Sequence, residues 1–252
     1  MLLLVPAGFV AGALNVVAGG GSFLTLPLLI FLGLPHDTAN GTNRLGILIQ
    51  GAGATAAFRR AEAIAAPLLL RLGLAAVVGA GLGSVAALRV GEAVFLRFLS
   101  IVIVLFTLAP LLEGVIRRRS GPAGEAAGAA ASPPSRASSA LCLAFLGVGF
   151  YGGFLQAGVG FLSLAATSRA GFGMVAGNAI KVACVFLFSI ISLAVFAANG
   201  AVHWVVGLAL GAGTFLGALV GARLTLKAGD RTLRIVVSAA ACAFAVALWL
   251  RA

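Results

Sequence analysis

Two basic side chains, Arg44 and Lys181, lie inside stretches that are otherwise apolar enough to cross a membrane. A charge in the hydrocarbon layer costs at least about 2.5–3.5 kcal/mol on insertion scales, so it needs a partner or a water-filled cavity. Arg44 can hold an oxyanion through two parallel hydrogen bonds, whereas Lys181 acts as a point charge. The similar placement of both cations favours a shared cavity that attracts an anion. The alternative is that each side chain extends to its nearer membrane interface.

A glycine-rich break precedes each of these cations. Gly19-Gly20-Gly21 interrupts the apolar run from Leu2 to Leu34, and Gly158-Val159-Gly160 interrupts a second run. Glycines weaken a helix, and where the helix restarts its free N–H groups and dipole favour an anion. Ser22 is expected to cap the first restart. Two related breaks in a membrane protein are typical of a transporter binding site.

Short polar side chains cluster around both breaks and can donate hydrogen bonds to an anion. Singly, each is equally well explained by a hydrogen bond between helices, worth about 0.6–2 kcal/mol. Together they favour a binding site. The candidate binding residues are Arg44, Lys181, Asn15, Gly19, Gly20, Gly21, Ser22, Thr42, Asn43, Gln156, Gly158, Gly160 and Asn178.

The composition is typical of a multi-pass membrane protein. Of 252 residues, 62% are hydrophobic and 9% are charged, whereas soluble domains carry roughly a quarter charged residues. The net charge of +11 is explained by basic loops that orient the chain, and no basic stripe with interleaved aromatics indicates nucleic acid. The three cysteines and two histidines are too scattered to form a metal site or a catalytic centre. We therefore expect no enzyme activity, metal or cofactor.

A polar linker divides the chain into two similar halves. The linker covers residues 117–137 and is rich in Ala, Gly, Pro and Ser; it separates a first repeat, 1–116, from a second, 138–252. Four short matches recur in the same order in both halves, so we expect an internal repeat. They pair Gly8–Asn15 with Gly149–Gln156, Gly19–Gly21 with Gly158–Gly160, Gly41–Arg44 with Gly177–Lys181, and Gly79–Gly81 with Gly211–Gly213.

The loop charges predict the topology. Lys and Arg concentrate near 59–71, in and beside the linker, and near 223–234, and such clusters prefer the cytoplasm. Residues 1–33 and 138–171 must then enter the membrane and turn back. We predict an all-α polytopic membrane protein of two inverted repeats, each a broken, re-entrant-type helical hairpin plus three transmembrane helices. The linker is expected in the cytoplasm and both termini outside. Predicted spans include 39–58, 67–88, 93–113, 174–198 and one ending near Lys227.

Glycines at helical spacing predict a second feature, which is close helix packing. They lie at Gly73, Gly79 and Gly83 in the first half and between Gly207 and Gly221 in the second. Small residues let helix backbones approach within a membrane. We expect these helix faces to be buried against other helices.

Several motifs occur together at the start of each half. The glycine run at 19–21 is followed by Pro27-Leu28-Leu29, Gly33-Leu34-Pro35 and Ala39–Asn43, and the second half carries Gly149–Gly160 and Ala176-Gly177-Asn178. With these motifs the chain resembles the sulfite exporter TauE/SafE family over nearly its whole length. The resemblance implies a bacterial or archaeal inner-membrane permease of small anions. It also implies substrates such as sulfite, sulfoacetate and related organosulfur or C2 compounds.

These observations predict a secondary transporter of a small anion in the bacterial inner membrane. Sulfite, a sulfonate or a related organosulfur or C2 anion is the favoured substrate, moved by alternating access at a site between the two breaks. The expected partners are this anion and the lipid bilayer; a homo-oligomer is left open. The alternatives are a transporter of another small solute and a membrane assembly or interaction protein that transports nothing.

Overall fold

The computed structural model describes residues 3–17, 20–61, 64–105 and 138–227, and these residues form helices and short connections without any strand. The all-α prediction is confirmed for this part of the chain. The linker at 117–137, the end of the span 93–113 and the third span of the second half, which must follow Lys227, lie outside the described residues. The helices are α1 Leu4–Val17, α2 Ser22–Phe31, α3 His36–Ala61, α4 Ala66–Leu88, α6 Ser139–Phe154, α7 Val159–Arg169, α8 Met174–Ala198 and α9 Trp204–Lys227, with a further helical stretch over 92–105.

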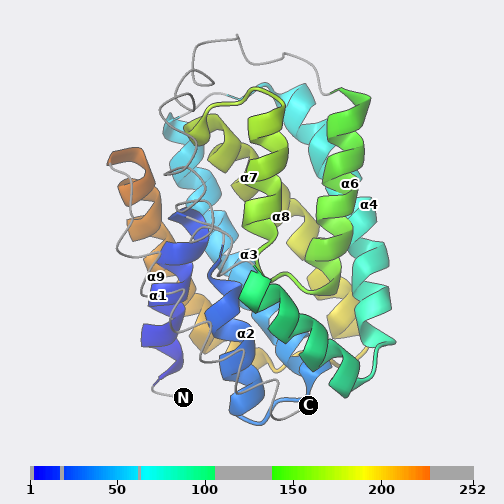
Figure 1. The fold of residues 1–252 in the computed structure, drawn as a ribbon. Coiled ribbons are helices and arrows are strands. Elements are labelled where there is room, and N and C mark those ends of the chain that lie inside the picture. Colours follow the sequence, from blue (N-terminus) through cyan, green and yellow to red (C-terminus); the bar gives the residue numbers. More distant parts are fainter. Residues whose placement is uncertain (1–2, 18–19, 62–63, 106–137, 228–252) are drawn as a thin grey trace, which may run out of the picture.

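The long helices stand side by side, and α3 and α8 lie at the centre of the bundle (Figure 1). α1 packs along α9 on one side and α4 packs along α6 on the other; these are the two most extensive helix contacts. α3 also contacts α9, and α8 contacts α4. The connections after α2 and α8 lie at one end of the bundle, whereas those after α3 and α7 lie at the opposite end (Figure 1).

Both predicted breaks are confirmed as interruptions between two short helices. α1 ends at Val17 and α2 begins at Ser22, and α6 ends at Phe154 before α7 begins at Val159. At a rise of about 1.5 Å per residue, these four helices are roughly 15–24 Å long, less than the hydrocarbon core of about 30 Å. Each of these four described helices is therefore shorter than the hydrocarbon core is thick. The arms of each pair run in opposite directions (Figure 1).

Three described helices are long and apolar enough to cross a membrane, namely Ala66–Leu88, Val175–Ala198 and Trp204–Arg223. They match the predicted spans at 67–88 and 174–198 and the span expected to end near Lys227. α3 covers the predicted span 39–58 but is less apolar, because it carries several buried polar residues. These are Asn40, Thr42, Asn43, Arg44 and Gln50.

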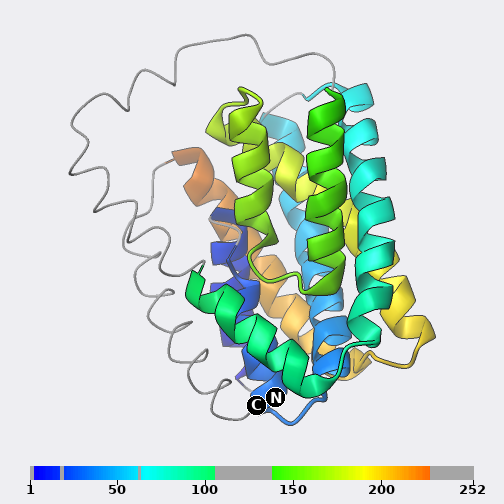
Figure 2. The same cartoon turned by 45° about the vertical axis from the view of Figure 1, so that its right-hand side comes forward.

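The helical stretch 92–105 passes across α2, as the turned view shows (Figure 2). Its residues Phe95 and Leu99 are fully buried in one apolar cluster with Leu26 and Leu29 of α2. The Phe95 ring lies 6.3 Å from the Phe154 ring, measured between centroids. This stretch therefore packs the first hairpin against the end of α6.

The predicted glycine faces are confirmed by close helix contacts. A Cβ added at Gly83 would lie 2.0 Å from the carbonyl of Phe150 in α6, and one at Gly217 would lie 1.9 Å from the carbonyl of Phe9 in α1. Gly79 and Gly213 make the same kind of contact in the same helix pairs. These distances leave no room for a side chain, so glycine is needed for α4 to meet α6 and for α9 to meet α1.

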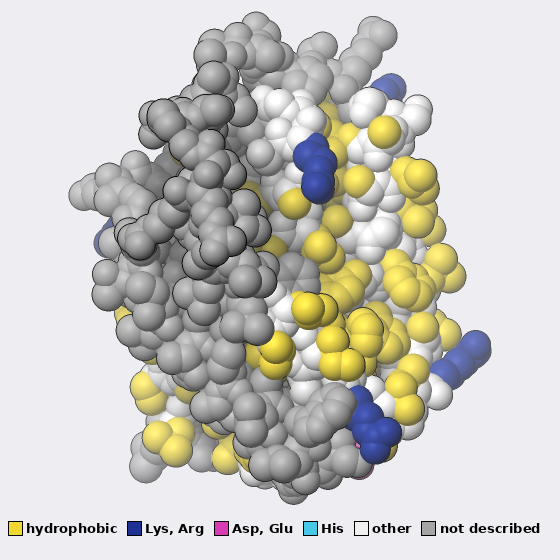
Figure 3. Space-filling view, in the orientation of Figure 1, with side chains coloured by type: hydrophobic (Ala, Val, Ile, Leu, Met, Phe, Trp, Pro, Cys, Tyr) yellow, Lys and Arg dark blue, Asp and Glu magenta, His cyan; other side chains and the backbone are white. Residues whose placement is uncertain are grey.

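The described surface exposes many large apolar side chains, and two cations lie in the largely apolar interior. Large apolar side chains such as Leu70, Leu143 and Val205 are more than half exposed, while Arg44 and Lys181 are buried. In the face shown, hydrophobic side chains gather between Lys and Arg side chains that lie towards the two ends (Figure 3). This distribution suits a bundle whose sides meet lipid.

Candidate functional site

Arg44 is fully buried in α3, the helix that follows the first hairpin. Its Nη1 donates to the carbonyl of Gly152 and, over 2.5 Å, to Oε1 of Gln156. Its Nη2 donates to the carbonyl of Gly153 over 2.6 Å and to Oδ1 of Asn40 over 3.1 Å. The guanidinium thus binds the last turn of α6, where unpaired carbonyls and the helix dipole favour a cation.

Lys181 makes the corresponding contacts from α8, the helix that follows the second hairpin. It is 2% exposed. Its Nζ donates to the carbonyl of Val16 over 2.9 Å, to the carbonyl of Asn15 over 3.3 Å and to Oδ1 of Asn178 over 2.6 Å. Lys181 therefore binds the last turn of α1, as Arg44 binds the last turn of α6. Both cations are thus buried and hydrogen-bonded within the bundle.

Two buried donors at the second break lack a partner among the described residues, namely Nε of Arg44 and Nε2 of Gln156. Gln156 has a positive φ of 68°, and Gly158, which precedes α7, has a φ of 76°. A left-handed conformation is unusual for a residue with a side chain and is found mainly where the surrounding structure enforces it. The second break is therefore a sharp, well-defined turn that holds unpaired donors.

The first break is closed around small residues. A Cβ at Gly21 would lie 2.1 Å from the carbonyl of Ala11, so only glycine lets α2 start against α1. Gly20 lies near the Phe161 ring of α7, and the rings of Phe23 and Phe161 stack with centroids 6.4 Å apart. The two hairpins therefore meet at their breaks. Gly19 lies outside the described residues.

Ser22 does not cap α2 as the sequence predicted. Gly21 is the residue that precedes the helix, and it forms no side-chain cap. Ser22 is instead the first helical residue, and its Oγ accepts a hydrogen bond from Asn43 over 3.4 Å. Asn43 also accepts one from Thr25 Oγ1 over 2.7 Å. These three side chains join α2 to α3.

Thr42 lies away from the breaks. Its Oγ1 accepts a hydrogen bond over 2.8 Å from the main-chain amide of His203, just before α9. His203 lies in the connection between α8 and α9, so this contact joins α3 to that connection. The hydrogen bond with His203 accounts for the buried hydroxyl of Thr42 without a ligand.

A small cavity lies between the first and second halves of the chain, where Lys181 and the two breaks come together. Its volume is about 20 Å³, which is room for about one water molecule. Polar side chains and a glycine of the second break line part of this cavity; they are Asn15, Gln50, Lys181 and Gly160. The rest of the lining consists of Ile47, Gly51, Val159, Val182 and Val185. Asn15 Nδ2 donates to Gln50 Oε1 over 3.3 Å. The structure therefore brings together three of the predicted residues, namely Asn15, Gly160 and Lys181.

Gln50 is a binding candidate that the sequence prediction missed. It is 5% exposed in α3, one and two helical turns beyond Ile47 and Asn43, so the three share one face of the helix. An uncharged amide inside the predicted span 39–58 was the available signal. It was overlooked because Gln50 is distant in sequence from both glycine breaks.

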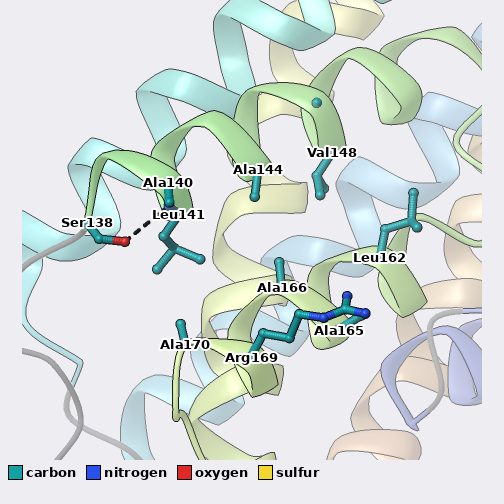
Figure 4. Close-up of a pocket in the computed structure, with 11 residues that line it drawn as sticks. Ser138, Ala140, Leu141, Ala144, Val148, Leu162, Ala165, Ala166, Arg169 and Ala170 are labelled. Carbon is teal, nitrogen blue, oxygen red and sulfur yellow. Dashed lines mark hydrogen bonds between the residues drawn. The ribbon is translucent and has the colours of Figure 1, made fainter.

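A larger cavity of about 530 Å³ lies between α6 and α7. It is lined mainly by alanine, leucine and valine, with Ser138 and Arg169 as its polar residues (Figure 4). Ser138 Oγ is occupied as the cap of α6, because it accepts a hydrogen bond from the amide of Leu141 over 3.2 Å. Arg169 is exposed. This apolar groove lacks the converging buried donors of the small cavity, so it is the weaker anion-site candidate.

No group of three or more His, Cys, Asp and Glu residues that could hold a metal ion occurs in the described part of the chain. The buried charged side chains around the breaks are instead the cations Arg44 and Lys181. The arrangement can attract a negative charge, but it offers no metal ligands at the positions that the structure covers.

Comparison with known proteins gives one consistent result. The family model described as "Sulfite exporter TauE/SafE" matches residues 4–248. A probable membrane transporter protein of Sinorhizobium, ORF9, is 32% identical over 98% of this chain and 92% of its own length. A probable membrane transporter protein of Haemophilus influenzae is 30% identical over 94% of this chain and 89% of its own. YunE of Bacillus subtilis, also described as a probable membrane transporter protein, is 26% identical over 94% and 92%. No solved structure matches the chain significantly.

Proposed function

We propose that this chain, which belongs to the sulfite exporter TauE/SafE family, is a secondary transporter of a small anion. The family is one of membrane transporters rather than enzymes, and the chain is a multi-pass membrane protein. The observation that carries the proposal is the pair of buried cations, each placed at the break of a hairpin from the other half of the chain. Buried charges at the meeting point of broken helices mark transport sites in membrane proteins.

The proposed architecture is a pair of inverted repeats, 1–116 and 138–252, joined by a cytoplasmic linker at 117–137. Three features support it. The described helices of the two halves follow in the same order with similar lengths, so that α1 corresponds to α6, α2 to α7, α3 to α8 and α4 to α9. The first helix of each half packs against the fourth helix of the other half, since α1 contacts α9 and α6 contacts α4. Finally, α1 starts from one end of the bundle and α6 from the opposite end (Figure 1).

The proposed substrate is sulfite, a sulfonate or a related organosulfur or C2 anion. The family description names sulfite, and the cations with nearby amides suit an anion that has several oxygen acceptors. Lys181, Asn15 and Gly160 line the cavity. We propose that the other candidates, Arg44, Gln156, Gly158, Asn178, Asn43, Ser22, Thr42, Gly20, Gly21 and Gly19, shape the breaks or join the site when it opens.

The proposed mechanism is alternating access. A cavity of about 20 Å³ holds about one water molecule, which has a single heavy atom, whereas sulfite has four. The anion can enter only when the helices around the cavity separate. The short hairpin arms are suited to this motion, because each ends inside the bundle and contacts the other at its break. Opening towards one membrane face at a time would then carry the anion across.

Uptake of radiolabelled sulfite into proteoliposomes tests the proposal. The purified full-length protein is compared with Lys181→Gln, Arg44→Gln and the control Arg89→Gln, which changes an exposed cation outside both cavities. Loss of a charge-assisted contact of about 1.5–3 kcal/mol predicts at least about a tenfold weaker apparent affinity for Lys181→Gln. The control is expected to match wild type. Wild-type flux equal to that of protein-free vesicles, for sulfite and for short sulfonates, would exclude anion transport of this class.

A further inference from the structure

We propose that the groove between α6 and α7 binds one phospholipid with an anionic headgroup, with an acyl chain in the groove and the phosphate at Arg169. This inference goes beyond the proposed function, because it concerns a second ligand that is not transported. The groove has a volume of about 530 Å³, which lies within the range of about 300–1,000 Å³ that is usual for sites of small molecules.

The length of the groove matches one leaflet of the membrane. On α6 its lining runs from Ser138 to Val148, which is about 15 Å along a helix. The hydrocarbon core is about 30 Å thick, so the groove extends about halfway into it. It begins at the end of the bundle where α6 starts and α7 ends (Figure 1). An acyl chain of a single leaflet can therefore lie along it.

Small side chains create this hollow on α6, whose other outward positions carry large ones. Leu143 is 70% exposed and Phe150 is 44% exposed on the same helix, whereas a Cβ added at Gly147 would meet nothing within 4 Å. Apart from Ser138 and Arg169, the lining consists of alanine, leucine, valine and glycine. Water is a poor occupant of such a groove, because a bound water needs two to four polar partners. An apolar chain suits these walls better.

The charge at the open end of the groove favours a negatively charged headgroup. Arg169 is exposed in the last turn of α7, and its side chain extends along that helix past Ala166 (Figure 4). The acidic residues that the structure describes are Asp37, at the start of α3, and Glu92, just after α4. Both positions belong to the opposite end of the bundle (Figure 1). Arg169 therefore has no carboxylate partner in the described part of the chain.

The orientation predicted from the loop charges places this end of the groove in the cytoplasm. Basic pockets between transmembrane helices on that side bind the headgroups of anionic lipids. The phosphate of such a lipid accepts hydrogen bonds from a guanidinium. Arg169 and the apolar lining thus match the two ends of one lipid molecule.

The groove lies between the two arms of the second hairpin, α6 and α7. A lipid in it would contact both arms and pack one against the other. Because a ligand that binds only the folded state stabilises that state, binding is measurable as a rise in melting temperature. The acyl chain and the headgroup contribute separately, so one substitution can be directed at each.

Lipid-dependent thermal stabilisation of the purified full-length protein in detergent tests the inference. Dioleoyl phosphatidylglycerol, which is anionic, is titrated beside the zwitterionic dioleoyl phosphatidylethanolamine and the soluble headgroup analogue glycerol 3-phosphate. Phosphatidylglycerol is expected to stabilise wild type at about fivefold lower concentration than phosphatidylethanolamine. Glycerol 3-phosphate should have no effect, because it has no acyl chain.

Two variants change the groove, and each has a matched control outside it. Gly147→Leu should weaken the response to phosphatidylglycerol at least about tenfold, because the added side chain displaces methylene groups of the lipid. Arg169→Gln should weaken it about fivefold and remove the preference over phosphatidylethanolamine. Gly91→Leu and Arg89→Gln change exposed residues that do not line the groove and should respond as wild type does. Should Gly147→Leu fail to fold, Ala144→Phe takes its place.

Three results would overturn the lipid assignment. The first is an equal response of wild type, Gly147→Leu and Arg169→Gln to phosphatidylglycerol. The second is stabilisation by glycerol 3-phosphate as strong as that by the lipid. The third is an unchanged lipid response of Gly147→Leu together with conversion of a dimer into a monomer or a lower melting temperature, which would assign the groove to a second copy or to the residues after Lys227. Anion flux is not part of this measurement, so the outcome is independent of the proposed function.

Discussion

Lys181 of α8 donates a hydrogen bond over 2.9 Å to the main-chain carbonyl of Val16 in α1, although 165 positions separate the two residues in the chain. Arg44 of α3 makes the reciprocal contact with the carbonyl of Gly153 in α6 over 2.6 Å. Each half of the described chain thus supplies a cation that binds the broken helix of the other half. The two breaks are coupled, because a movement of either hairpin changes the surroundings of a buried charge.

Arg44→Gln is expected to destabilise the protein. The substitution leaves the carbonyls of Gly152 and Gly153 without their buried donor, and an unsatisfied buried acceptor costs about 1–3 kcal/mol. Arg44→Lys should be intermediate, because one ammonium cannot reproduce the spread of a guanidinium. Thermal unfolding in detergent measures both variants. Unchanged melting of Arg44→Gln would show that the contact with α6 contributes little to stability.

Gly149→Ala and Gly147→Ala form a matched pair on α6. A Cβ at Gly149 would lie 2.1 Å from the carbonyl of Ala76, whereas one at Gly147 would meet nothing within 4 Å. Gly149→Ala should destabilise by about 1–3 kcal/mol through overpacking, while Gly147→Ala should be neutral or stabilise by up to about 1 kcal/mol. Thermal unfolding of both variants provides the measurement. Equal behaviour of the pair would contradict close packing of α4 on α6.

The two hairpins should cross-link at their breaks. Phe23 of α2 and Phe161 of α7 stack with ring centroids 6.4 Å apart. In a background with Cys142, Cys184 and Cys242 replaced by serine, the pair Phe23→Cys and Phe161→Cys is expected to be joined by a short bifunctional maleimide, detected by mass spectrometry of the digested protein. The pair Phe23→Cys and Leu143→Cys serves as the control, because Leu143 is 70% exposed in α6. Alternating access predicts that a transported anion changes the cross-linking yield. A substrate-independent yield would argue against movement of these hairpins.

The proposed topology can be tested by labelling cysteines in intact cells with a membrane-impermeant maleimide. In the same cysteine-free background, Asn199→Cys is expected to react from outside. Gly171→Cys, in the connection after α7, should react only after the membrane is permeabilised. Both positions are exposed, and the two connections lie at opposite ends of the bundle (Figure 1). Reaction of Gly171→Cys but not Asn199→Cys in intact cells would reverse the orientation.

Helix positions were largely predictable because of two simple signals. Apolar length locates helices that can cross a membrane, and glycine runs locate their interruptions. α4 and α8 accordingly match the predicted spans within one residue. The capping role of Ser22 was wrong, because the close approach of Gly21 to Ala11 in α1 makes glycine the residue that precedes α2. That approach is a tertiary contact and leaves no local pattern.

The residue types of the candidate site were predictable, but their contacts were not. Burying Arg44 and Lys181 in apolar spans requires acceptors, and the sequence by itself determined that such acceptors or a cavity must exist. Only the tertiary structure decided that the acceptors are helix ends of the opposite half and that Gln50 borders the cavity with Lys181. The reason is that these contacts join residues on different helices, whose relative placement depends on packing of the whole bundle rather than on local sequence.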